Sequence, residues 1–196
     1  MHRDVRLIAL AVSALASSLV LLALGCRPNN ANQSTLVDWK LREFNDFKVI
    51  VPTNLVRDVD MEKQTVEAGP RGFIRGAEVY RGGERENLRI EVSSVTYGKP
   101  LVPDLDRGLE EVLSLIAKSL DDPSPNRSIS STVVSGLPAK AADYHLSRGN
   151  RHMYIHFIVT GSKGKLWSLR VSYTDRKLEP AARKVLRTFQ VKAPSV

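Results

Sequence analysis

The chain has 196 residues, of which 42% are hydrophobic and 26% are charged. This length and balance predict one globular domain with a leader, and they exclude a disordered chain and a protein with many membrane spans. Lys and Arg (29) outnumber Asp and Glu (21), giving a net charge of +8, which favours anionic surfaces as partners. The basic residues are scattered and form no aromatic-interleaved motif, so we expect no nucleic-acid partner.

The first 25 residues have the pattern of a targeting segment. Arg3 and Arg6 precede an uncharged apolar run over 7–25, as in secretory signal peptides. The alternative is a permanent transmembrane anchor, because a span needs about 20 apolar residues. The single cysteine of the chain, Cys26, follows the run; one cysteine excludes an internal disulfide and a cysteine cage for zinc.

The stretch LLALGC, which ends at Cys26, resembles a bacterial lipobox. Gly25 meets the requirement for a small residue before the cysteine, whereas Ala23 departs from the usual leucine. The resemblance implies cleavage after Gly25 and acylation of Cys26, for example with palmitate, so that buried methylenes hold the protein at a membrane. We therefore expect a signal peptide over 1–25, a lipidated cysteine and polar tether over 26–38, and a domain over 39–196.

The first part of the domain is predicted to be mostly strands. FKVIVP (47–52) indicates a strand that ends at Pro52, and LVRDVD (55–60) is a second, weaker candidate. FIRGAEVYRGG (73–83) and ENLRIEVSSVTYG (86–98) indicate a hairpin. With a four-residue loop at 82–85, the hairpin would pair Val79 with Leu88, Ala77 with Ile90 and Glu78 with Arg89.

Two segments have helical periodicity. The first, 104–120, begins at the capping residue Asp104 and ends before DDPSP (121–125). Its apolar residues recur at steps of three and four: Leu105, Leu109, Val112, Leu113, Ile116 and Leu120. The second helix begins near Pro180, which suits a first turn. Its apolar stripe comprises Leu178, Ala182, Val185, Leu186 and Phe189.

Two further hairpins are expected between these helices. A two-residue turn at Gly149–Asn150 would pair Leu146 with Met153, Tyr144 with Ile155 and Ala142 with Phe157, whereas a three-residue loop would set Leu146 against His152. The shorter turn is preferred because it matches apolar residues with apolar residues. A three-residue loop over 162–164 would then pair Met153 with Tyr173, Ile155 with Val171, Phe157 with Leu169 and Val159 with Trp167.

These registers place polar side chains on the opposite face of the three strands: Asp143, His145, Ser147, His152, Tyr154, His156, Arg170 and Ser172. Asp143, His156 and Arg170 would form one row. The preferred interpretation is a polar face with cross-strand ion pairs. The alternative is a metal site formed by Asp143, His145, His152 and His156, although no compact ligand spacing such as HExxH is present. With no GxSxG elbow and no phosphate-binding loop, we expect neither catalysis nor a cofactor.

Three stretches of the chain resemble the PsbP-like family: FKVIVP, VVSGLPAKAADYH and AARKVLRTFQV. The resemblance covers about residues 40–192. It implies an α+β fold in which helices flank an antiparallel β-sheet (a PsbP-like α-β-α sandwich), and a domain that binds or supports other proteins without catalysing a reaction.

The sequence therefore predicts a lipid-anchored protein of the bacterial cell envelope, whose noncatalytic domain docks a protein or an anionic envelope component. Arg27 is not the aspartate that retains some lipoproteins at the inner membrane, so the choice of membrane stays open. The candidate docking residues lie at two hairpin tips: Arg148, Arg151, Lys163 and Lys165. The alternative function is binding of a small ligand or a metal at the histidine-bearing face.

Overall fold

The computed structural model describes residues 39–51, 55–83, 88–120, 126–148 and 151–192. The predicted signal peptide, Cys26 and the tether lie outside the described residues. The elements in chain order are β1 (Lys40–Glu43), β2 (Phe47–Val51), β3 (Val56–Arg57), α3 (Val59–Glu67), β4 (Ile74–Gly82), β5 (Leu88–Tyr97), α4 (Leu105–Ser119), β6 (Asn126–Val134), β7 (Leu137–Arg148), β8 (Arg151–Ser162), β9 (Lys165–Tyr173), η1 (Arg176–Leu178), α5 (Glu179–Thr188) and β10 (Gln190–Val191). None of the helices in this described part is long and apolar enough to cross a membrane.

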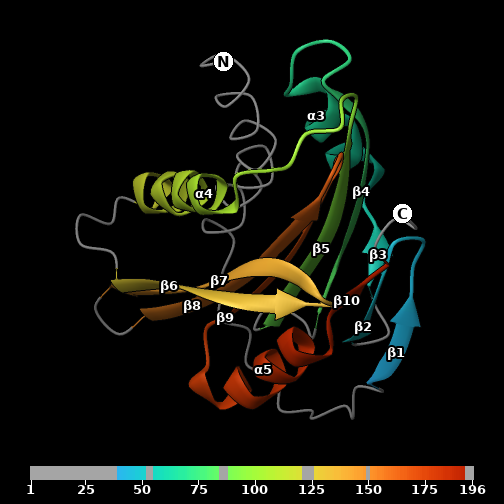
Figure 1. Cartoon of the computed structure of the whole chain (residues 1–196). Coiled ribbons are helices and arrows are strands. Elements are labelled where there is room, and N and C mark those ends of the chain that lie inside the picture. The colour runs from blue at the N-terminus through green and yellow to red at the C-terminus, as the bar shows by residue number, and fades with distance from the viewer. Residues whose placement is uncertain (1–38, 52–54, 84–87, 121–125, 149–150, 193–196) are drawn as a thin grey trace.

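A seven-stranded antiparallel sheet forms the centre of the domain, in the order β3-β4-β5-β9-β8-β7-β6. One face carries α3 and α4, which we call the α4 layer. The other face carries η1, α5 and a small antiparallel sheet, β1-β2-β10, which we call the α5 layer (Figure 1). The α+β fold predicted from the sequence is confirmed, with the antiparallel sheet flanked by helices.

The α4 layer covers a core of alternate residues from the sheet. Helix α4 begins where predicted, because the Asp104 carboxylate accepts a hydrogen bond from Arg107 N at 3.1 Å. Its apolar stripe packs against side chains such as Tyr97, Tyr144 and Phe157. The buried residues of the helix are Gly108, Leu109, Val112, Leu113 and Ile116.

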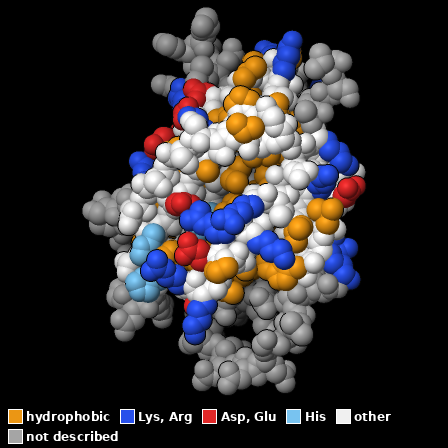
Figure 2. All heavy atoms as spheres, turned by 60° about the horizontal axis from the view of Figure 1, so that its bottom comes forward, with side chains coloured by type: hydrophobic (Ala, Val, Ile, Leu, Met, Phe, Trp, Pro, Cys, Tyr) orange, Lys and Arg blue, Asp and Glu red, His pale blue; other side chains and the backbone are white. Residues whose placement is uncertain are grey.

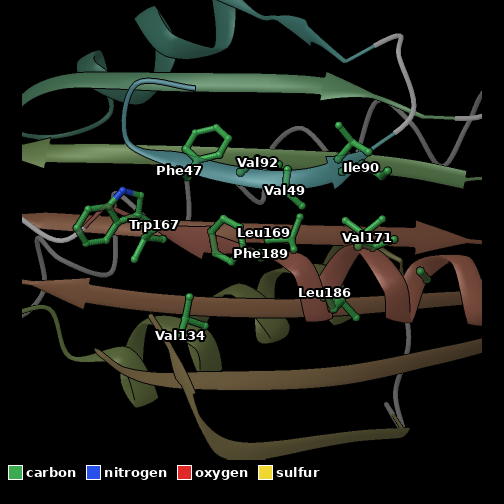
Figure 3. Packing of buried hydrophobic residues seen from close by; sticks show 14 of the residues in the cluster. Phe47, Val49, Ile90, Val92, Val134, Trp167, Leu169, Val171, Leu186 and Phe189 are labelled. Atoms are coloured by element: carbon green, nitrogen blue, oxygen red, sulfur yellow. The ribbon is translucent and has the colours of Figure 1, made fainter. Parts of the chain in front are cut away.

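The α5 layer closes a second core on the opposite face of the same strands. Helix α5 has Pro180 in its first turn and buries Ala182, Val185 and Leu186, as its sequence periodicity predicts. Strand β2 adds alternate residues, Phe47, Val49 and Val51, all fully buried. These side chains meet residues of β5 and β9, including Val92, Trp167 and Leu169 (Figure 3).

The predicted pairing of β7 with β8 is confirmed, and the pairing of β8 with β9 is wrong by one residue. The structure pairs Leu146 with Met153 and Tyr144 with Ile155. In the next hairpin, however, Ser162 pairs with Lys165, so the loop has two residues, Lys163 and Gly164. Gly164 has φ +83°, which a glycine adopts without a steric penalty. A slip of one residue moves every β9 side chain to the other face.

The hairpin of β4 and β5 is present, but its register differs from the prediction by five residues. Val79 pairs with Ser93 instead of Leu88, and Ala77 pairs with Val95 instead of Ile90. Pairing stops at Gly82 with Ile90, so the connection is longer than four residues. Because β5 is buried on both faces over most of its length, its apolar residues alone do not select one register.

The segment 55–60 does not form a long strand. It contributes only the two residues of β3 and then enters helix α3, which the sequence analysis missed. The Asp58 side chain accepts a hydrogen bond from Met61 N at 3.0 Å, so it caps the helix. The local capping interaction therefore ends the extended conformation after Arg57.

Candidate functional site

The histidine-bearing face faces the α5 layer, and its composition differs from the prediction. Asp143, His145, His152 and His156 share this face on β7 and β8, because Asp143 pairs with His156 and His145 with Tyr154. Arg170 and Ser172 are excluded from it by the β8–β9 register, which brings Val171 and Tyr173 there instead. The predicted row of Asp143, His156 and Arg170 is therefore wrong in its last member.

His156 is the centre of a buried hydrogen-bond chain and is only 5% exposed. Its Nδ1 contacts Asp143 Oδ1, and its Nε2 lies 2.9 Å from the Tyr173 hydroxyl. Burial raises the pKa of Tyr173 to about 12, so the neutral hydroxyl is available to donate to Nε2. With both ring nitrogens engaged within the fold, His156 links β7, β8 and β9, and neither nitrogen is free to ligate a metal in this arrangement.

The chain of polar contacts continues from Asp143 to helix α5. Arg183 Nη2 lies 3.4 Å from Asp143 Oδ2, so it connects α5 to β7. Both side chains are partly exposed, so this ion pair is a modest addition to the packing of the apolar stripe. Asp143, His156 and Tyr173 thus connect strands β7, β8 and β9 beneath α5, and Asp143 connects them to Arg183 of the helix.

The other two histidines form a separate pair nearer the β7–β8 turn. His145 Nε2 and His152 Nδ1 are 3.3 Å apart. The His145 ring stacks on Tyr154 with a centroid distance of 4.5 Å, and Tyr154 stacks on Tyr173. The four alternative metal ligands thus fall into two pairs. Among the described residues, no group of three or more His, Cys, Asp or Glu is placed to hold a metal ion.

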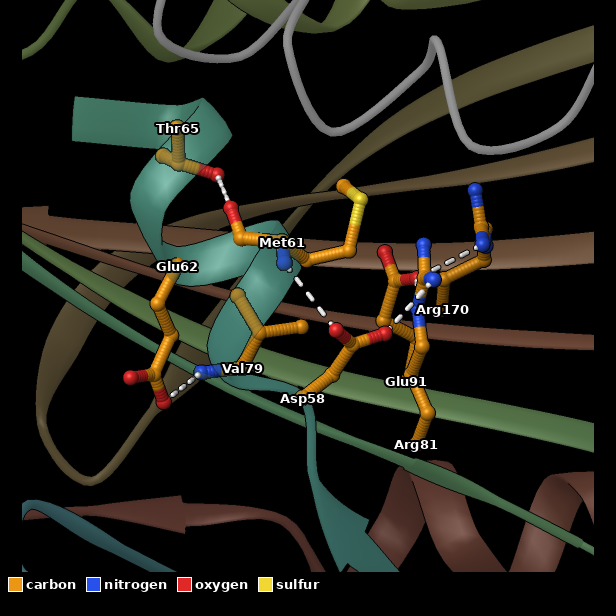
Figure 4. A network of polar contacts seen from close by, with 8 residues as sticks. All are labelled: Asp58, Met61, Glu62, Thr65, Val79, Arg81, Glu91 and Arg170. Carbon is orange, nitrogen blue, oxygen red and sulfur yellow. Dashed lines mark hydrogen bonds and ion pairs between the residues drawn. The ribbon is translucent and has the colours of Figure 1, made fainter. Parts of the chain in front are cut away.

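Arg170 belongs to an ion-pair network on the face covered by the α4 layer. Glu91 accepts from Arg170 Nη2 at 2.8 Å and from Arg81 Nε at 2.6 Å, and Arg81 also contacts Asp58 (Figure 4). The network connects the start of α3 with β4, β5 and β9. The ion pair of Arg170 with Glu91 is the buried part of the network, and its opposite charges compensate each other there. Arg81 and Asp58 are partly exposed, and Arg81 Nη2 has no hydrogen-bond partner among the described residues.

Glu62 of α3 extends this network to the edge of the sheet. Its Oε1 accepts from Val79 N at 3.1 Å and from Arg57 Nε at 2.7 Å. Burial acts to raise the pKa of Glu62, but the hydrogen bonds from Arg57 and Val79 outweigh it and lower the pKa below the ordinary value. The carboxylate is therefore ionised at neutral pH and fastens α3 onto β4.

The four candidate docking cations lie at two hairpin tips, as expected, and the two tips are at opposite ends of β8. Arg148 and Arg151 are backbone partners at the β7–β8 turn. Lys163 lies in the β8–β9 turn and Lys165 follows it, at the other end of the twelve-residue strand β8. Lys165 Nζ also forms an ion pair with Asp46 and lies 5.7 Å from the Trp167 ring centroid. Lys165 therefore stabilises the junction between the small sheet and the central sheet.

The α5 layer instead collects most of the positive surplus. Residues 39–51 and 175–192 contain nine Lys or Arg and four Asp or Glu, and Lys and Arg side chains are spread across this side of the molecule (Figure 2). In α3 and α4 with their capping residues, eight Asp or Glu stand against three Lys or Arg. Sheet cations such as Arg57, Arg127 and Lys140 pair with several of these acids. The net positive charge is therefore concentrated on the α5 side, which attracts anions.

A shallow groove of about 580 Å³ lies at the C-terminal end of α5. Apolar side chains such as Val134, Phe189 and Val191 line it together with three cations, Lys48, Arg187 and Lys192, and one acid, Glu43. One wall is held by Ser135, whose hydroxyl accepts from Val191 N at 2.9 Å. The groove combines apolar surface with a positive rim, which suits an amphipathic anion.

The sequence analysis did not assign Arg183, Lys184, Arg187 or Lys48 to a docking surface. The helical spacing of the cations in α5 indicated part of this basic surface. On a helix whose apolar stripe is Ala182, Val185 and Leu186, the cations occupy the remaining sides. What the sequence does not show is that β2 packs beside this helix and adds Lys48 to the same layer.

Comparisons with known proteins identify the fold. The sequence matches no protein-family model and no curated protein. Among solved structures, cyanobacterial PsbP (CyanoP) from Synechocystis sp. PCC 6803 is similar, with a TM-score of 0.50, 12% identity, and coverage of 84% of this chain and 98% of CyanoP. LpqN of Mycobacterium tuberculosis, described as involved in cell envelope biogenesis, gives a TM-score of 0.42, 16% identity and coverage of 85% and 99%. A protein from Bacteroides thetaiotaomicron gives a TM-score of 0.41, 10% identity and coverage of 74% and 45%.

The CyanoP match confirms the PsbP-like fold expected from the three sequence stretches. At this level of identity the likeness concerns the fold alone. A fold does not specify a reaction or a partner, so a functional argument has to begin from the side chains of this chain.

Proposed function

We propose that this chain is a lipid-anchored protein of the bacterial cell envelope, and that its noncatalytic domain docks an anionic envelope component through the α5 layer. Residues 1–25 act as the signal peptide, residues 26–38 as the lipidated cysteine and tether, and residues 39–196 as the docking domain. The lipobox-like stretch before Cys26 supports the anchor, and the cations of the α5 layer support docking of an anion.

The unbalanced positive charge of the α5 layer carries this proposal. Packing requires only the buried stripe of α5, and its exposed positions tolerate any polar residue. They are nevertheless occupied by Lys184 and Arg187, while Lys48 and Lys192 border the groove beside them. Because the α5 layer carries unbalanced positive charge whereas the charges of the α4 layer are largely paired, the α5 side is attracted to an anionic surface before contact.

The place where the tether joins the domain agrees with this orientation. The described chain begins at Trp39, which packs against the core of the α5 layer, and Lys184 Nζ lies 5.5 Å from its ring centroid. The tether therefore joins the domain on the basic side. Twelve residues, 27–38, span at most about 40 Å, which keeps the domain close to the lipid-modified residue.

The contacts of the polar side chains support a noncatalytic role. His156 uses both ring nitrogens in contacts within the fold, to Asp143 and to Tyr173. His145 stacks on Tyr154. These residues stabilise the sheet, and we assign the activity of the domain to contact with its partner.

The anchor is tested on the native full-length protein. Mass spectrometry of the N-terminal peptide should find an acylated Cys26 as the first residue, and Cys26→Ala should move the protein out of the membrane fraction. A native peptide in which unmodified Cys26 is still joined to Gly25 would contradict the anchor.

The docking surface is tested by photo-crosslinking in cells that express the lipidated protein. A crosslinking residue at position 187, in the last turn of α5, should give a reproducible adduct, and one at position 118, in the last turn of α4, should not. Arg187→Glu combined with the probe at position 184 should weaken the adduct, whereas Lys118→Glu changes the charge equally and serves as the control. The mass of the adduct distinguishes an acidic protein from a phospholipid. Equal crosslinking from both helices would sink the proposal.

A further inference from the structure

Strand β6 is an edge of the central sheet, and it is long and uncovered by the other described elements. It has nine residues, Asn126–Val134, of which only Val134 is buried. At the opposite edge, β3 has two residues. Exposed edge strands of this length template pairing with another strand unless charges, proline or a bulge protect them; β6, with the sequence NRSISSTVV, has one charge and no proline.

The turn after β6 decides which backbone groups point outward. Ser135 and Gly136 form a two-residue turn with φ values of +50° and +82°, and Val134 pairs with Leu137. The closing pair of such a turn exchanges both hydrogen bonds, so the even-numbered residues of β6 bond to β7. The odd-numbered residues, Arg127, Ile129, Ser131 and Val133, therefore direct their N–H and C=O groups away from the sheet.

The neighbouring charges are turned toward α4 and leave the edge neutral. Arg127 Nη2 lies 3.1 Å from Glu110 Oε2, and Lys140 Nζ of the adjacent strand lies 2.7 Å from Asp106 Oδ1. Both cations are thus paired with the helix above them. The edge also exposes an apolar side chain, Val133, which is 66% exposed.

We propose that β6 pairs antiparallel with β6 of a second copy of this chain. A register centred on Ser130 overlaps all nine residues and sets Arg127 opposite Val133 of the second copy, so no like charges meet. This pairing joins the outward-facing odd-numbered residues of both strands in hydrogen bonds. It also covers Val133 in each copy.

The symmetry of this pairing agrees with the proposed function, on which this step of the inference rests. Two antiparallel edge strands are related by a two-fold axis perpendicular to the sheet. Such an axis leaves the faces of the sheet unchanged, so both α5 layers point to the same side. Two basic layers and two tether junctions then face one envelope surface, and docking becomes bivalent.

Cysteine crosslinking in the lipidated full-length protein tests the register. In the proposed pairing Ser130 faces Ser130 of the second copy without intervening hydrogen bonds, at a Cα separation of about 4.5 Å, which a disulfide can bridge. Ser130→Cys should give a covalent dimer after mild oxidation. Ser128→Cys is the matched control, because its two copies would be about 14 Å apart along the strands. The unsubstituted protein, which contains only Cys26, gives the background.

Ser131→Pro tests the hydrogen bonds without breaking the β6–β7 pairs, because residue 131 points its N–H outward. Combined with Ser130→Cys it should abolish the covalent dimer, while the circular dichroism spectrum of the domain is retained. Two results would overturn the inference: a folded Ser130→Cys protein that stays monomeric, or a Ser128→Cys protein that gives the same yield of covalent dimer. The edge of β6 would then be covered by another strand or by the tether. Either of these results would leave the crosslink from position 187, and with it the docking proposal, intact. Conversely, loss of the crosslink from position 187 while the covalent dimer still forms would remove the docking proposal and leave the dimer.

Discussion

The two outer layers of this domain solve the same packing problem with helices of similar design, yet they differ in charge. Both α4 and α5 bury an apolar stripe against alternate residues of the same strands. The α4 layer has an acidic surplus, and its charges are largely paired, as in Arg107 with Glu111. The α5 layer has a basic surplus, and its cations surround a groove.

The comparison shows that the fold requires the buried apolar stripes of both helices but does not require the exposed charges. Burial of the stripes accounts for both helices equally. The cations of α5 contribute little to stability, because exposed ion pairs are worth only about 0–1 kcal/mol. A surplus of positive charge that packing does not require indicates a role in recognition. The following predictions test whether the two layers contribute similarly to stability through their buried residues.

The largest expected effect is the loss of a core side chain, which should be similar in both layers. Leu113→Ala in α4 and Leu186→Ala in α5 each remove a buried side chain and should lower the free energy of unfolding by about 2–5 kcal/mol. Urea unfolding measures both. If only one variant were destabilised, the two helices would not be equivalent in packing.

A smaller loss is expected from the polar link between α5 and the sheet. His156→Ala leaves the buried Tyr173 hydroxyl without its partner and should cost about 1–3 kcal/mol. His145→Ala is the matched control on the same face; since His145 is only half-buried and bonds a more exposed histidine, its effect should stay within about 0.5 kcal/mol. Equal losses in urea unfolding would show that His156 has no special structural role.

The success and the failure of sequence reasoning here have the same physical cause. The β7–β8 register was predictable because Ala142, Tyr144 and Leu146 alternate with polar residues, and one register matches apolar with apolar. Strand β9 is apolar on both faces, with Leu166 in one core and Trp167 in the other. Its register is decided by the two-residue turn at Gly164, which the sequence does not distinguish from a three-residue loop.

The same ambiguity limited prediction of the candidate site. Asp143 and His156 were placed together correctly, because they lie within the hairpin whose register was right. Arg170 was assigned to the wrong face, and so the ion-pair network with Glu91 was missed. The basic layer depends on the contact of β2 with α5, two segments more than 120 residues apart, and no local pattern reports such a contact.

The start of the two helices should differ in sensitivity to their capping residues. Asp104→Ala removes the cap of α4 and should cost about 1 kcal/mol. Helix α5 has no side-chain cap at Leu178, and Asp175 caps only the short η1 that precedes it. Asp175→Ala should therefore cost less than Asp104→Ala in parallel urea titrations. The reverse order would indicate that η1 and α5 form as one unit nucleated at Asp175.

The smallest change in stability at neutral pH is expected from replacing one buried tyrosine in each core, and the two replacements should differ. The buried hydroxyl of Tyr97 has no hydrogen-bond partner among the described residues, whereas that of Tyr173 bonds His156. Tyr97→Phe should therefore be neutral or slightly stabilising, and Tyr173→Phe should cost about 0.5–1.5 kcal/mol. Thermal unfolding near pH 7 compares them.

Alkaline pH should affect both positions in the same direction. Burial raises the pKa of Tyr97 and Tyr173 above the ordinary value, that of Tyr173 to about 12. A raised pKa in the folded state gives a stability contribution that is complete below about pH 10 and is lost as the pH rises toward the folded-state pKa. The loss of unfolding free energy between about pH 9 and about pH 11 should be smaller in each Phe variant than in the unsubstituted protein. An identical loss in all three proteins would mean that these phenols do not titrate with folding, and that other groups, such as the lysines of the α5 layer, set the alkaline limit of the domain.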